Sequence, residues 1–195
     1  VEEYGSLDVM VNNAGVTVVE PVLELDPEEW RHVIDVNLSG VFYCAQAAGR
    51  RLVEQGTGGQ MINVSSMFGS VGIQGRAPYN ASKGGVNALT KCLAVEHAEH
   101  DVCVNAMAPG YIETELTAET RESDDRGTRL GREEWPYYGY DDTHIENRTP
   151  LGRFGTLEEI GNVALFLAEG DHYTTGEVLT SDGGWSAFGW GSKGR

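Results

Sequence analysis

Four short apolar runs alternate along the chain with longer segments of helical spacing, and this alternation constrains the fold most strongly. The apolar runs cover residues 7–11, 61–64, 102–107 and 177–181, and the helical segments cover about 27–55, 79–97 and 156–168. Short apolar runs bounded by turn residues are typical of buried strands. Strands that alternate with helices indicate βαβ units in a parallel sheet, so we expect an α/β fold that binds ligands at the carboxyl ends of its strands.

Capping residues support the helix assignments. Asp26 precedes Pro27 and two glutamates, a pattern typical of a helix N-terminus. Thr156 and Glu159 have the spacing of a capping box, which predicts that the last helix begins directly after Thr156. The glycine-rich stretch that begins at Gly56 is expected to end the first helix.

The composition limits what the protein contacts. Its 195 residues carry a formal net charge of −16, 40% are hydrophobic and 23% are charged, which suits a single globular domain with its own core. No stretch approaches the ~18 consecutive apolar residues of a membrane span. Because so acidic a surface repels phosphate backbones, we expect a small-molecule substrate and no nucleic-acid or membrane partner.

The three cysteines, Cys44, Cys92 and Cys103, form no C-x-x-C pair and fall inside apolar periodic segments. This pattern predicts reduced, buried thiols and a cytoplasmic location, and no metal site is expected. The chain begins at Val1 without a basic segment followed by an apolar one, so we expect no targeting peptide in it.

Tyr79 and Lys83 are four residues apart in a predicted helix, which places the phenol and the ammonium on one face. A neighbouring cation favours the phenolate, so we expect Lys83 to lower the pKa of Tyr79 and to make it a proton donor and acceptor near neutral pH. Taken alone, the pair also fits an exposed tyrosine above a lysine that merely supports a surface helix.

Two further polar residues are candidates for the same site. Ser66 follows the strand through Val64, at the end where an open α/β sheet binds its ligand, so its hydroxyl is expected to hold a substrate oxygen. For the neighbouring Ser65 we expect only loop capping. Asn37 lies on the apolar stripe of the first long helix, where its amide is expected to satisfy a backbone kink, to order a water, or both.

Several short motifs follow one another along the chain. They are Asn12-Asn13-Ala14-Gly15, Asn37, Asn63-Val64-Ser65-Ser66, Tyr79-x-x-x-Lys83, Pro109-Gly110 and Asp182-Gly183-Gly184. In this order and at this spacing they resemble the short-chain dehydrogenase/reductase family, over essentially the whole chain apart from residues 117–150. The resemblance implies a Rossmann-like, doubly wound parallel sheet and an NAD(P)-dependent oxidoreductase. Such an enzyme would interconvert a secondary alcohol and a ketone on a sugar, a polyol or a 3-oxoacyl substrate.

The resemblance also implies a catalytic tetrad of Asn37, Ser66, Tyr79 and Lys83. Tyr79 would exchange a proton with the substrate oxygen, and Ser66 would hold and polarise that oxygen. Lys83 would lower the Tyr79 pKa and hydrogen-bond the nicotinamide ribose. Asn37 would hold a water that relays protons from Lys83 to solvent.

A set of residues would contact the cofactor, NAD or NADP, by the same resemblance. They are Asn12, Asn13, Ala14, Gly15, Tyr79, Lys83, Pro109, Gly110, Ile112 and Thr114. The first four would stabilise the sheet and pass close to the adenosine ribose, and the last two would meet the nicotinamide carboxamide. Asp182-Gly183-Gly184 is expected to be a structural turn after the last strand, at a subunit interface. The sequence does not decide between NAD and NADP.

The family's glycine-rich phosphate loop would precede Asn12 by about one βαβαβ half, whereas only eleven residues do. We therefore expect a single domain over residues 1–195, the C-terminal portion of an N-terminally truncated enzyme, with an exposed apolar edge at the strand over 7–11. Residues 117–150 form a long polar connection with Trp135 and three tyrosines. This segment is predicted to be a substrate lid, and an acidic loop remote from the site is the alternative.

Two rival functions remain open. A nucleotide-sugar epimerase or dehydratase can share the Tyr-x-x-x-Lys pattern, but the residues after Thr156 leave no room for its substrate domain. A catalytically inactive remnant or interaction module, which lacks the phosphate-binding loop, is the second rival. For the enzyme, the resemblance implies a homo-oligomer, either a tetramer or a dimer.

Overall fold

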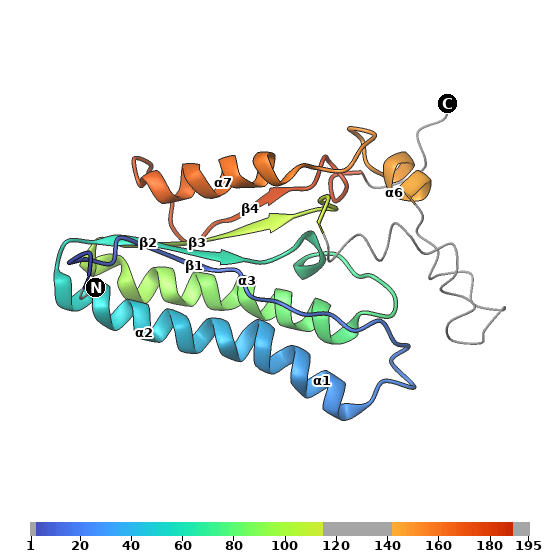
Figure 1. Ribbon diagram of the computed structural model, residues 1–195, viewed down its shortest axis with the longest axis horizontal. Helices are drawn as coiled ribbons and strands as arrows, with labels where there is room; N and C mark the ends of the chain where they lie inside the picture. The colour runs from blue at the N-terminus through green and yellow to red at the C-terminus, as the bar shows by residue number, and fades with distance from the viewer. Residues whose placement is uncertain (1–2, 115–141, 189–195) are drawn as a thin grey trace.

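Four parallel strands lie between two layers of helices in the computed structural model, which describes residues 3–114 and 142–188 (Figure 1). The strands, in their order across the sheet, are β1 (Val9–Asn12), β2 (Gly59–Val64), β3 (Val102–Pro109) and β4 (Val178–Ser181). Each neighbouring pair is parallel. The predicted α/β fold with a doubly wound parallel sheet is confirmed.

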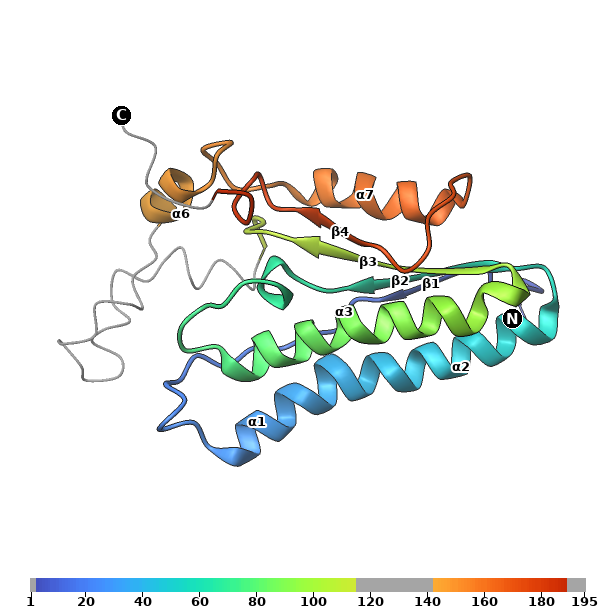
Figure 2. The ribbon, with the colours of Figure 1, turned by 180° about the vertical axis from the view of Figure 1, so that it is seen from behind.

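Helices cover both faces of this sheet (Figures 1 and 2). One face carries α1 (Pro27–Ile34), α2 (Gly40–Gln55) and α3 (Ala77–His97), and the other carries α7 (Leu157–Glu169). The short helix α6 (Asp142–Arg148) lies beyond the end of the sheet toward which the strand arrows point. Within the described residues, no helix has the length and apolar character needed to cross a membrane.

The two faces of the sheet are buried in separate apolar clusters. Beneath α2 and α3 the cluster consists of Ala45, Leu52, Met61, Leu93, Ala94, Val102 and Val104. Beneath α7 it is built on Ile62, Met107 and Leu167. Full burial of one such aliphatic side chain contributes about 1.5–3 kcal/mol, so the helices are held to the sheet mainly by these contacts.

The predicted helix ends are confirmed where caps were expected. The Asp26 side chain accepts a 2.8 Å hydrogen bond from the Glu28 amide, with Pro27 at the first helical position. Thr156 and Glu159 form the reciprocal capping box at the start of α7. Gly56 ends α2 with a left-handed backbone (φ 67°), a conformation that glycine adopts without strain.

The prediction of one regular helix over residues 27–55 is wrong in its middle. Between α1 and α2, residues Asp35–Ser39 form a π-helical turn in which the Gly40 amide donates to the Asp35 carbonyl. The apolar spacing continues through this turn, so the sequence pattern did not reveal it. Such π-helical insertions are frequent at functional sites, and Asn37 lies in this one.

The prediction of buried cysteines is also wrong. Cys44 and Cys92 are exposed and Cys103 is half-buried. The buried stripe of α2 includes Val41 and Ala45, and it leaves Cys44 on the exposed side of the helix. Membership in an apolar segment therefore did not determine which side of the helix these thiols occupy.

The edge of the sheet is as expected at β1. Among the described strands β1 pairs with β2 alone, and Val11 is 44% exposed on it. Of the predicted lid over 117–150, residues 117–141 lie outside the described residues. The lid, like the single-domain assignment over 1–195, stays a prediction.

A buried polar chain joins β1, β2 and α3 in the middle of the core. The Asn12 amide donates to the Asn63 side-chain oxygen over 2.8 Å, and the Asn63 amide donates to the Thr90 hydroxyl over 2.9 Å. Thr90 in turn donates to the Val86 carbonyl on its own helix. Because Asn63 and Thr90 are fully buried, these bonds fix the position of α3 against β2.

Replacing the central member of this chain should destabilise the fold. We expect Asn63→Ala to lower the free energy of unfolding by about 2–4 kcal/mol, because it leaves the Asn12 amide and the Thr90 hydroxyl without their partner. Urea denaturation measures the difference. The control is Asn162→Ala on α7, where the side chain is exposed and little loss is expected. Equal effects of the two substitutions would contradict the structural role of Asn63.

Candidate active site

A cleft of about 300 Å³ opens at the carboxyl ends of β2 and β3. The predicted site residues that line it are Asn13, Gly15, Ser66, Tyr79, Lys83, Pro109, Gly110, Ile112 and Thr114. Apolar walls come from Phe68, Met107, Leu157 and Ile160. Residues that are more than a hundred positions apart in sequence therefore meet where an open parallel sheet binds its ligand.

Tyr79 and Lys83 lie on one face of α3, as their spacing predicts. The Lys83 ammonium is 5.6 Å from the centroid of the Tyr79 ring. It donates a 2.7 Å hydrogen bond to the Val64 carbonyl at the end of β2, and the lysine is only 3% exposed. The alternative of a lysine that merely supports a surface helix is therefore wrong.

Ser66 lies two residues after the end of β2 and lines the cleft together with Tyr79. Its backbone is extended, and its hydroxyl accepts a 3.2 Å hydrogen bond from the Phe68 amide, which caps a short 3₁₀ turn. The same hydroxyl hydrogen-bonds the Tyr79 phenol. A serine and a tyrosine hydroxyl are thus both available to one ligand oxygen. Ser65 bonds instead to the Asn87 side chain on α3, a structural role.

The pKa of Tyr79 differs from the sequence prediction. Burial raises the pKa of the phenol above its usual value of 10.0, and this effect exceeds the lowering by the Ser66 hydrogen bond and by the charge of Arg76. The expectation of a Tyr79 pKa below its usual value is corrected, because the loss of hydration on burial outweighs the contacts that favour the phenolate. Desolvation depends on tertiary packing, which the four-residue spacing does not encode.

The site also changes the pKa of Lys83. Burial lowers the pKa of its ammonium from 10.5 to about 8, because a charged group loses hydration in the core. Near neutral pH the lysine is therefore charged but can release its proton at modest cost. A buried ammonium with such a pKa, in a cleft with a tyrosine and a serine, is typical of a proton-transfer site.

Asn37 connects the loop after β1 to α3. Its amide donates to the Val16 carbonyl over 2.9 Å and to the Ser82 hydroxyl over 3.1 Å, and its side-chain oxygen accepts from the Val16 amide over 2.8 Å. Asn37 is fully buried and does not line the cleft itself. The side chain therefore holds a neighbouring loop in place and does not cap a break in its own helix.

Gly15 brings this loop next to Lys83. A β-carbon at Gly15 would lie 3.5 Å from the Asn37 side-chain oxygen and 3.6 Å from the Lys83 ammonium. These are ordinary contact distances, so the loop packs against both side chains at Gly15, and Gly15 itself lines the cleft. Of the neighbouring predicted contacts, Asn13 lines the cleft, whereas Asn12 is buried against Asn63 and Ala14 does not line it.

The turns after β3 and β4 support each other. A β-carbon on Gly110 would lie 2.6 Å from the Asp182 α-carbon, so only glycine allows this approach. Asp182 accepts hydrogen bonds from the Gly184 and Ser186 amides, and Gly183 has a left-handed backbone. The prediction that Asp182-Gly183-Gly184 is a structural turn is confirmed.

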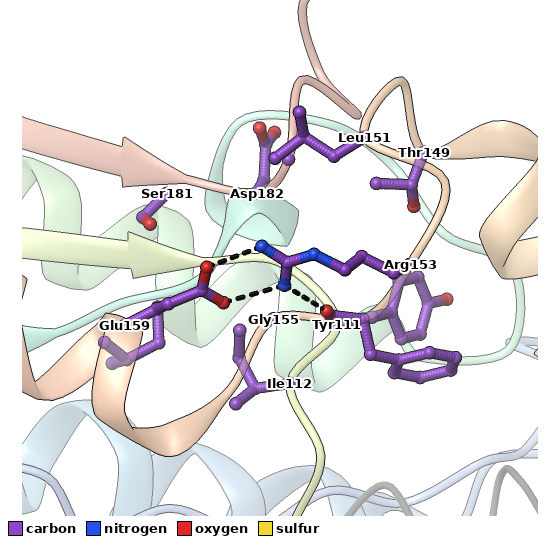
Figure 3. A pocket seen from close by; sticks show the side chains of 12 residues that line it. Tyr111, Ile112, Thr149, Leu151, Arg153, Gly155, Glu159, Ser181 and Asp182 are labelled. Atoms are coloured by element: carbon purple, nitrogen blue, oxygen red, sulfur yellow. Dashed lines mark hydrogen bonds and ion pairs between the residues drawn. The ribbon is translucent and has the colours of Figure 1, made fainter.

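A second, smaller pocket of about 100 Å³ adjoins the cleft and shares Tyr111, Ile112 and Ile160 with it. In Figure 3 the Arg153 side chain points across this pocket to Glu159, to which it donates two hydrogen bonds of 2.9 and 2.6 Å. The two charges neutralise each other. The pair joins the segment before α7 to the helix and is structural.

One cleft residue was missed by the sequence reasoning. Arg76, the residue just before α3, lines the cleft, and its charge acts on Tyr79. Its signal in the sequence was that it is the only cation between Ser66 and Tyr79. Among the described residues, no group of three or more His, Cys, Asp or Glu side chains is arranged to hold a metal ion.

The chain is similar in sequence to proteins of known family. The profile of the family described as Enoyl-(Acyl carrier protein) reductase matches residues 1–186. A 3-oxoacyl-[acyl-carrier-protein] reductase of Thermotoga maritima is 42% identical over 94% of this chain and 68% of its own length.

Solved structures of dehydrogenases have a similar fold. A short-chain type dehydrogenase/reductase from Mycobacterium marinum superposes with a TM-score of 0.80 at 38% identity, over 95% of this chain and 67% of that one. A gluconate 5-dehydrogenase from Burkholderia cenocepacia, in complex with NADP and tartrate, has a TM-score of 0.83 at 34% identity, over 96% and 68%. The chain thus spans about two thirds of the length of these relatives.

Lys83 should make stability depend on pH above neutrality. Its folded pKa of about 8 lies below its unfolded value near 10.5, so the free energy of unfolding should rise between these pH values and lose this contribution as pH falls through 8. Urea denaturation at pH 7 and pH 10 should show a rise in wild type that Lys83→Met lacks. Lys91→Met, at an exposed position of the same helix, should retain the rise. A rise of the same size in Lys83→Met would contradict the burial of a charged Lys83.

Glu159 should make stability depend on pH in the acid range. Its hydrogen bonds to Arg153 lower the pKa of the carboxyl from 4.5 to about 2, so its contribution is present above pH 4.5 and is lost as pH falls toward 2. The stability difference between wild type and Glu159→Gln should therefore shrink between pH 6 and pH 2.5. Glu158→Gln, next in the same turn, is the control and should show no such change. A constant difference for Glu159→Gln would be the contrary result.

Proposed function

Since the chain belongs to the short-chain dehydrogenase/reductase family, we propose that it carries the proton-transfer site of an NAD(P)-dependent oxidoreductase that interconverts a secondary alcohol and a ketone. Relatives named as 3-oxoacyl and gluconate enzymes are consistent with a 3-oxoacyl, sugar or polyol substrate. The observation that carries the proposal is the meeting of the Ser66 hydroxyl, the Tyr79 phenol and the Lys83 ammonium in one cleft.

Tyr79 exchanges the proton in this proposal. In the alcohol-to-ketone direction the phenol oxygen takes the hydroxyl proton of the substrate, and in reduction it returns a proton to the carbonyl oxygen. Ser66 donates a hydrogen bond to the same oxygen and polarises it. Because burial favours the neutral phenol, Tyr79 carries the proton that the reductive direction requires.

Lys83 and Asn37 connect Tyr79 to solvent. The Lys83 ammonium is anchored on the Val64 carbonyl, and its pKa of about 8 allows it to pass a proton on near neutral pH. It would also hydrogen-bond the ribose of a bound nicotinamide cofactor. Asn37 lies next to Lys83 beside Gly15 and would order a water that receives this proton, close to the loop that its side chain fixes to α3.

The cleft fits the nicotinamide end of the cofactor. Gly15 and the Lys83 ammonium lie side by side in its lining, and Asn13, Ile112 and Thr114 provide polar and apolar walls. The chemistry that the nicotinamide would supply when held by these residues is hydride transfer to or from the substrate carbon. A volume of about 300 Å³ lies at the lower end for ligand pockets, so it suits this end of the dinucleotide with a small substrate.

The alternative is a catalytically inactive remnant or interaction module. The observation in its favour is that the described residues include no glycine-rich strand–loop–helix to hold the pyrophosphate. The upstream reading frame of the gene decides between the two. A glycine-rich loop encoded in frame supports the enzyme, and a native start codon near Val1 supports the remnant. Homo-oligomeric assembly and a cytoplasmic location stay predictions.

Removing the phenol oxygen of Tyr79 should strongly reduce turnover. In the product of the complete reading frame, Tyr79→Phe keeps the ring but lacks the proton donor, so we expect kcat to fall by about 10²- to 10⁴-fold. Cofactor affinity should remain within about threefold of wild type, since the ring still packs in place. Steady-state kinetics with NAD(H) and NADP(H), together with calorimetry, measure both quantities.

The control for this substitution is Tyr173→Phe, at a tyrosine that is fully exposed between α7 and β4. It should leave kcat unchanged. If Tyr79→Phe also turns over within threefold of wild type, Tyr79 does not transfer the proton and the proposed function fails.

A further inference from the structure

The charges that the described residues bring to the cleft are of one sign. Its described lining includes two cations, Arg76 and Lys83, and no aspartate or glutamate. The chain as a whole has 30 acidic and 14 basic residues, so a cleft without a carboxylate among its described residues departs from the rest of the molecule. A cleft with walls of low dielectric constant and one sign of charge attracts a ligand of the opposite sign.

The two cations differ in how they are bound. Lys83 is buried and donates to the Val64 carbonyl, and the proposed reaction uses it. Arg76 is half-buried, and among the described residues no carboxylate lies within ion-pair distance of its guanidinium. Arg153 in the adjoining pocket is the opposite case, since its guanidinium is held by Glu159 (Figure 3).

The backbone holds Arg76 in place on both sides. The Arg76 carbonyl accepts from the Asn80 amide over 2.9 Å, and the preceding Gly75 carbonyl accepts from the Glu20 amide over 2.8 Å. The Asn80 side chain donates to the Phe68 and Val71 carbonyls, each over 2.8 Å, and thereby ties the loop to α3. The backbone that carries the guanidinium is thus already ordered before a ligand binds, so binding need not order the loop.

Arg76 lines the same cleft as Tyr79, so a ligand bound to Arg76 occupies the part of the cleft where the substrate reacts. Arg76 precedes Tyr79 by three residues, and its charge is close enough to favour the phenolate. An anion on Arg76 therefore lies in the same cleft as the phenol oxygen that exchanges the proton. The guanidinium is a planar fork of donors that matches a carboxylate in two parallel hydrogen bonds.

We propose that Arg76 binds a carboxylate of the substrate, so that the enzyme acts on a hydroxy acid or the corresponding oxo acid in preference to a neutral sugar or polyol. This inference rests on the proposed function and names its substrate class. A cleft of about 300 Å³, shared with the nicotinamide, limits the acid to a small one. Arg76 is then a specificity-determining residue whose positive charge selects the substrate.

Matched probes test the proposal in the product of the complete reading frame, with NADP present. D-gluconate and D-glucitol have the same carbon chain, with a carboxylate in one and a neutral hydroxymethyl group in the other. Calorimetry should give a Kd for D-gluconate at least about tenfold lower than that for D-glucitol. Arg76→Gln should weaken D-gluconate binding roughly ten- to hundredfold, the worth of a hydrogen-bonded charge, and leave D-glucitol binding unchanged.

Two further variants separate charge from structure. Arg76→Lys retains the charge without the fork and should recover part of the lost affinity for D-gluconate. Lys91→Gln removes one positive charge from an exposed position of α3 and should bind both probes as wild type does. Equal weakening of both probes by Arg76→Gln would indicate a structural role for Arg76 and would overturn the proposal.

Other outcomes also overturn it. The proposal fails if wild type does not bind D-gluconate, binds both probes equally, or binds D-gluconate as tightly after Arg76→Gln. It also fails if inorganic phosphate binds in an Arg76-dependent manner and D-gluconate does not, since the anion would then be a phosphate. In each of these cases a loss of turnover in Tyr79→Phe leaves the proposed function standing. Turnover that persists in Tyr79→Phe refutes the proposed function, whatever Arg76 binds.

Discussion

The hydrogen bond from the Lys83 ammonium to the Val64 carbonyl, 2.7 Å long, is the contact on which the site depends. It joins α3 to the last residue of β2, and Ser66 follows that strand end by two residues. Because Tyr79 lies one turn before Lys83 on the same helix, the bond also brings the phenol beside the serine. This arrangement buries a cation, and the loss of its hydration lowers the pKa of Lys83.

The sequence predicted those parts of the protein that follow from local patterns. Short apolar runs and caps at Asp26 and Thr156 predicted the strands, the helix ends and the parallel sheet, because strand and helix periodicities are local properties. The spacing of Tyr79 and Lys83 predicted one helix face. The position of Ser66 after a strand predicted its place at the ligand-binding end, since all carboxyl ends of a parallel sheet meet at one edge.

The parts that were missed depend on tertiary contacts. The pKa of Tyr79 follows from its burial, and burial is decided by what packs above the residue and not by the residue four positions away. Asn37 was expected to satisfy a kink in its own helix, to order a water, or both, and its bonds to Val16 and Ser82 from other segments were not foreseen. Arg76 stood out only once the structure brought it to a cleft whose described lining holds no carboxylate.

The most direct measurement of the central claim is a crystal structure of the product of the complete reading frame with NADP and an alcohol substrate. The account predicts that the reacting substrate oxygen lies within about 2.5–3.0 Å of both the Tyr79 phenol oxygen and the Ser66 hydroxyl, as expected for a hydrogen bond between two oxygens. Lys83 should remain bound to the Val64 carbonyl. A substrate oxygen bound away from Tyr79 and Ser66 would contradict the account.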